Sequence, residues 1–133
     1  MILPDSSAWI EGFRGTGSPA HQALDRLLRA RAEIVVTEPV IFEVFAGVRT
    51  RKELDLARSR LLAFPVVGLG GLATYERAAA LYRRCRAAGE EIRSGMDCVI
   101  AAVAIREGAS LLHQDRDFDV IAKHAPLAIE PVG

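Results

Sequence analysis

Four acidic residues stand at places in the sequence where a fold could bring them together. Asp5 directly follows the apolar pair Ile2-Leu3. Glu43 lies inside an apolar helical stretch, and Asp97 lies in the first turn of the most apolar helix that the sequence predicts. Asp115 lies three residues beyond another short apolar stretch. Carboxylate oxygens grouped in this way are the ligands that hard divalent cations prefer.

Placing these carboxylates in one cleft is unfavourable unless a cation joins them. Two carboxylates about 4 Å apart repel each other by roughly 4 kcal/mol at an effective dielectric of about 20. The repulsion raises their pKa values or opens the cleft. Mg²⁺ or Mn²⁺ removes it, because these ions suit all-oxygen sites with few protein ligands and retained waters. Such an ion also activates water and neutralises a phosphate, so the pattern indicates hydrolysis of a phosphodiester.

The elements that must position these acids alternate between short strands and helices. Apolar stretches predict strands at residues 2–3, 34–36, 66–67, 111–112 and 127–129, and helical patterns fall at 18–28, 37–47, 50–64, 75–89 and 94–108. This alternation implies βαβ units and a mostly parallel sheet that is covered by helices on both faces. Ligands of such sheets bind beyond the carboxyl ends of the strands, where Asp5 and Asp115 would lie. The following helices begin at the same edge, which adds Asp97, and Glu43 reaches it from one to two turns inside its helix.

Local structural roles compete with this functional interpretation. Capping hydroxyls are predicted at the helix starts Ser18, Thr37, Thr50 and Ser94, the last two in capping boxes completed by Glu53 and Asp97. Asp5 can likewise cap the short helix that follows it, and the acidic run at 115–119 can form a solvated turn. Glu43 is the hardest to explain locally, because Glu38 already supplies a polar face to the same helix. The metal site is therefore predicted from the joint placement of the acids and depends on the fold.

Length and composition describe one ordinary globular domain spanning residues 1–133. Half of the residues are apolar, and the 17 basic and 17 acidic residues cancel, so bulk charge gives no argument for nucleic-acid binding. Two cysteines are too few for a disulfide framework and form no zinc motif, which favours a reducing compartment. The chain has no apolar run of membrane-spanning length and does not start like a signal peptide. We therefore expect a cytoplasmic protein that does not enter the membrane.

Four stretches of the sequence, in order, resemble the PIN-domain family and in particular the VapC-like toxins of bacterial toxin–antitoxin pairs. They are Ile2-Leu3-Pro4-Asp5-Ser6-Ser7-Ala8-Trp9-Ile10, Pro39-Val40-Ile41-Phe42-Glu43-Val44-Phe45-Ala46-Gly47, Asp97-Cys98-Val99-Ile100-Ala101-Ala102-Val103-Ala104 and His113-Gln114-Asp115-Arg116-Asp117-Phe118. The resemblance implies a three-layer α/β/α sandwich with a mostly parallel sheet in the order 3-2-1-4-5. It also implies an Mg²⁺- or Mn²⁺-dependent endoribonuclease that leaves 5′-phosphate and 3′-hydroxyl ends.

The resemblance also assigns roles to individual residues. The acids that match the family's catalytic positions are Asp5, Glu43, Asp97 and Asp115. Of these, Asp5, Asp97 and Asp115 are the expected metal ligands, Glu43 is expected to act through a water, and Asp117 is a further candidate ligand. Ser7 matches the hydroxyl residue of the first motif. Two residues depart from the pattern: Pro4 has no N–H for a sheet, so the first strand should end there or lose a bond, and His113 replaces the usual Thr or Ser.

Surfaces for partners are predicted from two further patterns. The resemblance implies inhibition by a cognate VapB-like antitoxin, and toxin homodimers or heterotetramers and larger assemblies with the antitoxin. The two predicted helices at 37–64 carry a surplus of apolar side chains, among them Phe42, Phe45 and Leu56, so we expect the antitoxin to dock there. The same side chains could instead all belong to the core or form the homodimer contact.

Attraction of RNA must be local, because the net charge is zero. Basic residues outnumber acidic ones at 49–60 and again at 82–93. We predict that Arg49 and Arg51 contribute to a basic rim around the acidic cleft that holds phosphates; the alternative is an ordinary solvated helix face.

Other protein classes share parts of this pattern. A receiver-like, Mg²⁺-binding phosphoacceptor domain needs a Lys after a late strand, but the only lysines, Lys52 and Lys123, do not follow a strand. A phosphatase with a D-x-D nucleophile is disfavoured because Ser6-Ser7 follows Asp5. A catalytically inactive, RNA-binding PIN module is the third alternative, and the retained acids argue against it.

Overall fold

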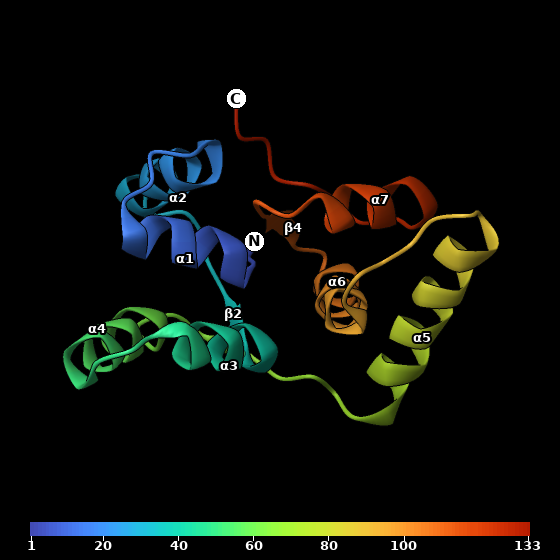
Figure 1. Ribbon diagram of the computed structural model, residues 1–133, viewed down its shortest axis with the longest axis horizontal. Coiled ribbons are helices and arrows are strands. Elements are labelled where there is room, and N and C mark those ends of the chain that lie inside the picture. Colours follow the sequence, from blue (N-terminus) through green and yellow to red (C-terminus); the bar gives the residue numbers. More distant parts are fainter.

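Short strands lie near the middle of the molecule and helices surround them (Figure 1). The computed structural model describes residues 1–133. In chain order the elements are β1 (Ile2–Pro4), α1 (Ser6–Arg14), α2 (Pro19–Arg29), β2 (Val36–Thr37), α3 (Glu38–Gly47), α4 (Arg51–Leu61), β3 (Val66–Val67), α5 (Leu72–Ala87), α6 (Gly95–Glu107), β4 (Ser110–Leu112) and α7 (Arg116–His124). No helix combines the length and the apolar character that a membrane crossing requires.

All strand pairs are parallel, as the alternation of strands and helices predicts. β1 pairs with β4, and β2 pairs with β3, which gives two small two-stranded sheets. Single parallel bridges join Ile2 to Ile34 and Leu111 to Ile129. The strand predicted at 127–129 is therefore reduced to one bridging residue, and the strand predicted at 34–36 begins only at Val36.

The end of β1 places Asp5 at the edge where β1 and β4 end. Pro4 is the last residue of the strand, as its missing N–H predicts, and the N–H of Asp5 then donates to the carbonyl of Leu112 at 2.8 Å. This hydrogen bond holds the carboxyl ends of β1 and β4 together. The helices that follow these two strands, α1 and α7, consequently begin close to each other (Figure 1).

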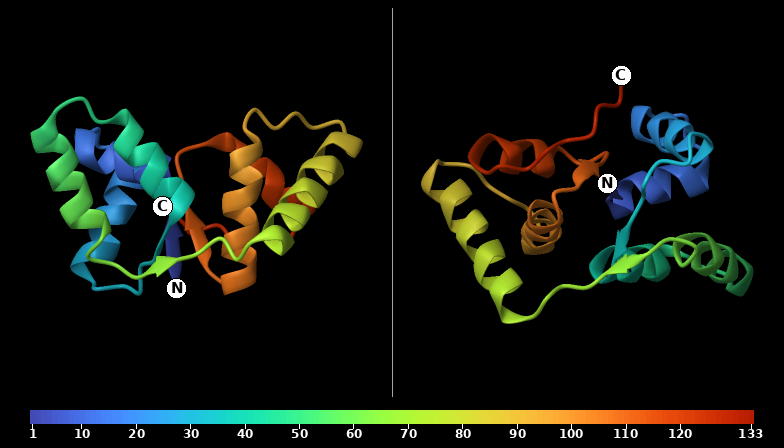
Figure 2. Two further views of the ribbon diagram at one scale, coloured as in Figure 1. Left: turned by 90° about the horizontal axis from the view of Figure 1, so that it is seen from below. Right: turned by 180° about the vertical axis from the view of Figure 1, so that it is seen from behind.

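Helix α6 forms the centre of the core. Every residue from Cys98 to Ala104 is buried, so the helix has no polar face in its middle, as its apolar sequence predicts. It packs against α5, α7 and α3 (Figure 2). Because its middle is enclosed on all sides, the packing of the core fixes the place of its first turn.

Two of the predicted side-chain caps are wrong. Ser18 and Thr50 do cap their helices, accepting from the N–H groups of His21 and Glu53. The Thr37 hydroxyl instead donates to the carbonyl of Val67 at 2.9 Å and so ties β2 to β3. Ser94 makes no side-chain capping bond, so the capping box predicted with Asp97 does not form.

Helix α7 was not anticipated as an element, because its acidic start looked like a turn. Asp115 is its N-cap and accepts from the N–H of Asp117 at 3.0 Å. Phe118 and Ile121 are fully buried and anchor the helix to the core. An acidic run that seems solvated in sequence is thus the capped first turn of an amphipathic helix.

Candidate metal centre

Three carboxylates from two helix starts form a tight cluster. Asp97 in the first turn of α6, Asp115 at the N-cap of α7 and Asp117 in its first turn each offer an oxygen, and these oxygens lie within 4.8 Å of one another. Asp97 and Asp117 are 5% and 1% exposed. The positive ends of two helix dipoles favour negative charge at this place. We call these three residues the acidic cluster.

Asp5 and Glu43 lie close enough to the cluster to interact with it electrostatically. Burial raises the pKa of Asp5, and the charge of Asp115 adds to this rise. Burial also raises the pKa of Glu43, with further contributions from Asp5 and Asp115. The Ser6 hydroxyl donates to Glu43 at 3.1 Å and orients that carboxylate. The structure thus gathers all four predicted acids at one place, and Asp117 joins them.

Asp97 experiences the strongest effect of this grouping. Burial, followed by the charges of Asp5 and Asp115, raises its pKa from 3.8 to about 8. The carboxylate has no capping bond to relieve it, because Ser94 does not form the predicted box with it. Without a metal ion, the site therefore holds a proton on Asp97 at neutral pH.

Several carboxylate oxygens of the site are buried without any hydrogen-bond partner. They are Asp5 Oδ1, Asp97 Oδ2 and Asp117 Oδ1. An unpaired buried acceptor costs roughly 1–3 kcal/mol, and more if it is charged. Two of these residues, Asp97 and Asp117, belong to the acidic cluster, and Asp5 is near enough to raise the pKa of Asp97. Carboxylate oxygens of this kind form the all-oxygen donor set that suits Mg²⁺ or Mn²⁺. The residues present therefore fit a divalent metal ion.

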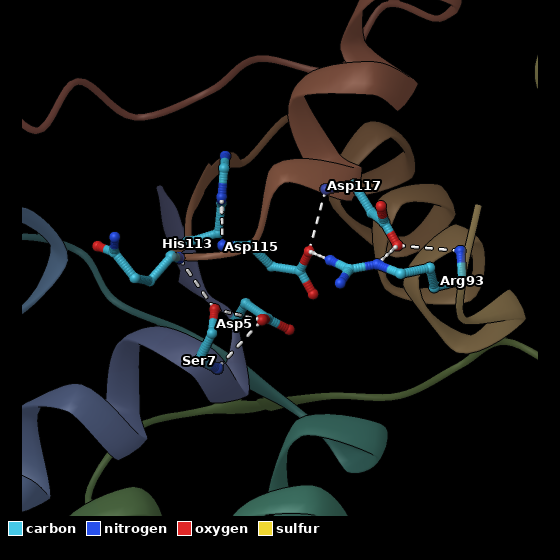
Figure 3. Close-up of polar contacts among 7 residues, drawn as sticks. Asp5, Ser7, Arg93, His113, Asp115 and Asp117 are labelled. Carbon is cyan, nitrogen blue, oxygen red and sulfur yellow. Dashed lines mark hydrogen bonds and ion pairs between the residues drawn. The ribbon is translucent and has the colours of Figure 1, made fainter. Parts of the chain in front are cut away.

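Asp5 serves local structure with one oxygen and leaves the other free. Its Oδ2 accepts from the hydroxyl of Ser7 at 2.6 Å and from the N–H of Ser7 at 3.1 Å, so it caps α1. The Ser7 hydroxyl in turn accepts from the N–H of Gln114 at 3.0 Å (Figure 3). The local and the functional interpretation of Asp5 are thus compatible, and Ser7 joins the start of α1 to the loop before α7.

His113 supports the backbone of the cluster rather than its carboxylates. Its Nδ1 accepts from the N–H of Asp115 at 3.0 Å, and its Nε2 lies 3.0 Å from Asp119 Oδ1. This pair of contacts fits the neutral ring with its proton on Nε2. The ring also packs on Phe118 with the ring centres 5.4 Å apart. His113 therefore fixes the turn in which Asp115 sits, without a hydroxyl group.

Arg93 is the residue at this site that the sequence analysis missed. Its Nη2 lies 3.2 Å from Asp115 Oδ1, and its Nε lies 3.5 Å from Asp117 Oδ2 (Figure 3). Its backbone N–H donates to Asp117 Oδ2 at 3.1 Å. In the sequence, Arg93 was only one member of a basic stretch; its position four residues before Asp97 was the available signal.

Arg49 and Arg51 are not brought to the acidic cluster. Arg49 lines a hollow of about 290 Å³ together with Ile10 and Arg14, towards the C-terminal end of α1, whereas Asp5 caps its N-terminus. The exposed Arg51 pairs with Asp55 one turn further along α4, at 3.1 Å. Their predicted role as a basic rim would therefore involve RNA that extends well beyond the cluster.

The lysines lie where a receiver-like mechanism has no use for them. Lys52 is in the first turn of α4 and Lys123 is in the last turn of α7, and both are exposed. Neither follows a strand. The phosphoacceptor alternative thus lacks the cation that its chemistry requires.

Comparisons with known proteins agree with this geometry. The PIN domain family model matches residues 2–124. Ribonuclease VapC11 of Mycobacterium tuberculosis (strain H37Rv) is 42% identical over 124 residues, which cover 92% of each chain. Among solved structures, VapBC2 from Rickettsia felis, bound to a DNA fragment from their promoter, has a TM-score of 0.75 at 17% identity and 98% coverage of both chains. A toxin–antitoxin complex from Klebsiella pneumoniae has a TM-score of 0.70 at 22% identity, covering 89% of this chain and 90% of the other. The range matched by the family model includes every acid of the site.

Proposed function

Because the chain belongs to the PIN-domain family, we propose that it is a VapC-type ribonuclease toxin that hydrolyses RNA phosphodiester bonds at the acidic cluster. The observation that carries this proposal is the cluster itself, with three carboxylate oxygens within 4.8 Å of one another. The 42% identity to a VapC ribonuclease over 92% of the chain supports the same conclusion. A cavity of about 670 Å³ adjoins the cluster and is lined by Ser7, Arg93 and Asp115, among others, which gives an RNA strand access.

We assign the metal ligands as Asp5, Asp97 and Asp115, with Asp117 joining them and Glu43 acting through a water. The unpartnered oxygens of Asp5, Asp97 and Asp117 support this set. A bound Mg²⁺ or Mn²⁺ supplies the charge that neutralises the scissile phosphate and activates water. The chain's own contribution is to hold the ligands in place: Ser7 orients Asp5, Ser6 orients Glu43, and the capped start of α7 orients Asp115.

The proposed activity is tested by the ends that the protein produces. Purified protein is incubated with total RNA in Mn²⁺, and the fragment ends are ligated and sequenced with and without prior phosphatase treatment. We expect discrete cuts with 5′-phosphate and 3′-hydroxyl ends, which vanish in excess EDTA. Full cleavage in EDTA, or 2′,3′-cyclic phosphate ends, would contradict the proposal, because cyclic ends arise from attack by the RNA's own 2′-hydroxyl.

We further propose that the two small sheets are halves of one sheet in the order 3-2-1-4-5 and that the protein works in the bacterial cytoplasm. The order is supported by the single parallel bridges from Ile2 to Ile34 and from Leu111 to Ile129, which link the sheets and add a fifth position. The compartment is supported by two buried free cysteines, by the bacterial relatives and by the RNA substrate.

We propose a cognate VapB-like antitoxin as the inhibiting partner. The structural neighbours include a toxin–antitoxin complex. Two apolar hollows flank α1: one of about 310 Å³ includes Trp9, Phe13 and Phe64, and one of about 290 Å³ includes Phe13 and Leu56. An amphipathic helix of the antitoxin fits such a surface, which runs along α1 from α2 and α4 in the first hollow to α3 and α4 in the second.

The apolar side chains at 37–64 that the sequence predicts to be surplus differ in their exposure. Leu56 and Leu62 are exposed, at 48% and 41%, and are available to a partner. Phe45 is not surplus, because it is partly buried and packs against the core. Hydrogen exchange with and without the antitoxin tests the docking surface: we expect added protection in α1 and between Val40 and Leu62. Absence of protection in both segments would show that the antitoxin docks elsewhere.

Phe42 is proposed for a different contact, between two copies of the chain. It is 72% exposed on α3 and lines neither hollow, and Leu72 at the start of α5 is 74% exposed. Exposed aromatic and aliphatic side chains of this size support a homodimer, and with the antitoxin a heterotetramer or larger assembly.

The predicted basic rim also remains a proposal. The double variant Arg49→Ala, Arg51→Ala is expected to weaken RNA binding about tenfold and to reduce the dependence of affinity on salt. The variant makes fewer phosphate contacts, so its binding releases fewer counterions from the RNA. Binding is measured with a catalytically inactive protein at several salt concentrations. An unchanged affinity and salt slope would show that this stretch does not contact RNA.

A further inference from the structure

Arg93 is the only cationic side chain that makes an ion pair with the acidic cluster. Its guanidinium contacts both Asp115 and Asp117 (Figure 3). Arg93 and Asp115 also line the cavity of about 670 Å³ that adjoins the cluster. The Arg93 side chain is 65% exposed, whereas Asp117 is 1% exposed. The positive charge therefore reaches the cluster from outside, on a flexible side chain, while the carboxylates are fixed by the fold.

We propose that the Arg93 guanidinium neutralises Asp115 and Asp117 in the metal-free site and competes with the metal ion for them. The inference rests on the proposed function, because it concerns two of the residues that we assign to the metal. The ion and the guanidinium are both positive and need the same carboxylates, so each weakens the binding of the other.

Two backbone hydrogen bonds keep Asp115 and Asp117 in position when the Arg93 guanidinium moves away from them. Asp117 Oδ2 accepts from the backbone N–H of Arg93, and Asp115 Oδ1 accepts from the N–H of Asp117. These backbone bonds do not depend on the Arg93 side chain. When an ion binds, the exposed side chain can swing into solvent or towards a phosphate of the RNA, while the carboxylates stay in position.

Replacement of the charge separates this role from a purely structural one. We compare the wild type with Arg93→Gln and Arg93→Lys, and use Arg116→Gln as the matched control. Arg116 is an exposed arginine on the adjacent first turn of α7 and makes no ion pair with the cluster. Mn²⁺ affinity is measured by isothermal titration calorimetry, without RNA, and the melting temperature is measured in EDTA.

We expect Arg93→Gln to bind Mn²⁺ at least about fivefold more tightly than the wild type and to melt at a lower temperature in EDTA. Arg93→Lys should raise the Mn²⁺ affinity about twofold, because its ammonium group makes only a single-point contact, and Arg116→Gln should leave the affinity at the wild-type value. If the Gln variant does not fold in EDTA, the Lys variant decides, through a gain in Mn²⁺ affinity that Arg116→Gln does not share.

Equal or weaker Mn²⁺ binding by Arg93→Gln would overturn the competition. If the wild type still cleaves RNA in Mn²⁺, that result leaves the proposed function intact. If neither protein binds Mn²⁺ at millimolar concentration, the competition is wrong and the metal assignment falls with it. An equal gain in affinity in Arg116→Gln would show that net charge, rather than the contact of Arg93, sets the affinity.

Discussion

Asp97→Asn is expected to abolish RNA cleavage, a loss of at least about a thousandfold, while the chain keeps its fold. Asp97 is the acid on which the other carboxylates act most strongly, and its pKa of about 8 reflects burial and the charges of Asp5 and Asp115. A neutral amide cannot supply the negative charge that a divalent ion needs at this centre. The substitution is nearly isosteric, so the surrounding packing of α6 stays unchanged.

Asp97→Asn is expected to fold because the Asp97 side chain makes no local structural contact. Its Oδ2 has no hydrogen-bond partner, and it takes part in no cap. Asn is neutral without binding a proton, so it avoids the cost of keeping Asp97 protonated in the folded state, and the variant should melt no lower than the wild type in EDTA. Asp25→Asn, an exposed acid on α2, is the matched control and should cleave normally.

Cleavage and melting are measured on the same preparations. If Asp97→Asn cut RNA at the wild-type rate, the acidic cluster would not be the catalytic centre. If it lost activity and also unfolded in EDTA, the loss would no longer be attributable to chemistry. The same substitution separates the proposed enzyme from an inactive RNA-binding module, whose RNA affinity does not depend on a metal ligand.

The placement of the acids was predictable from the sequence because it follows from topology. Asp5 and Asp115 each follow a strand of a parallel pair, and Asp97 opens a helix that starts at the same edge. These relations depend only on the order of the elements and on the rule that ligands bind beyond the carboxyl ends of parallel strands. An inexact strand length, such as the strand predicted at 127–129 that is a single bridge at Ile129, leaves the positions of these acids unchanged.

Directions of individual side chains were not predictable in the same way. The Thr37 and Ser94 hydroxyls stand at helix starts, yet Thr37 turns to Val67 because the neighbouring strand offers a carbonyl. The contacts of Arg93 join the α5–α6 loop to α7 and so depend on the packing of two distant segments. Sequence spacing carries no information on such contacts without a fold.

Stability of the metal-free protein is expected to fall steeply as the pH rises from about 5 to about 8. In the folded protein the pKa of Asp97 is about 8, whereas its ordinary value is 3.8. Between these values the folded state retains a proton that the unfolded state has lost. The free energy of unfolding therefore decreases with pH, by up to about 1.4 kcal/mol per pH unit for this one group. Burial raises the pKa values of Asp5 and Glu43 as well, which contributes in the same direction.

A divalent ion should reverse this dependence, because it stabilises the ionised carboxylates that high pH produces. Urea denaturation at pH 5, 6.5 and 8 is measured in EDTA and again in saturating Mn²⁺. We expect the wild type to lose about 2–4 kcal/mol across this range in EDTA, Asp97→Asn to lose much less, and Mn²⁺ to stabilise the wild type most at pH 8.

A flat profile in EDTA, or the same slope in Asp97→Asn, would show that Asp97 carries no proton in the folded metal-free protein. The acids would then be held apart well enough to ionise together, and relief of their repulsion could not be the reason that the site binds a cation.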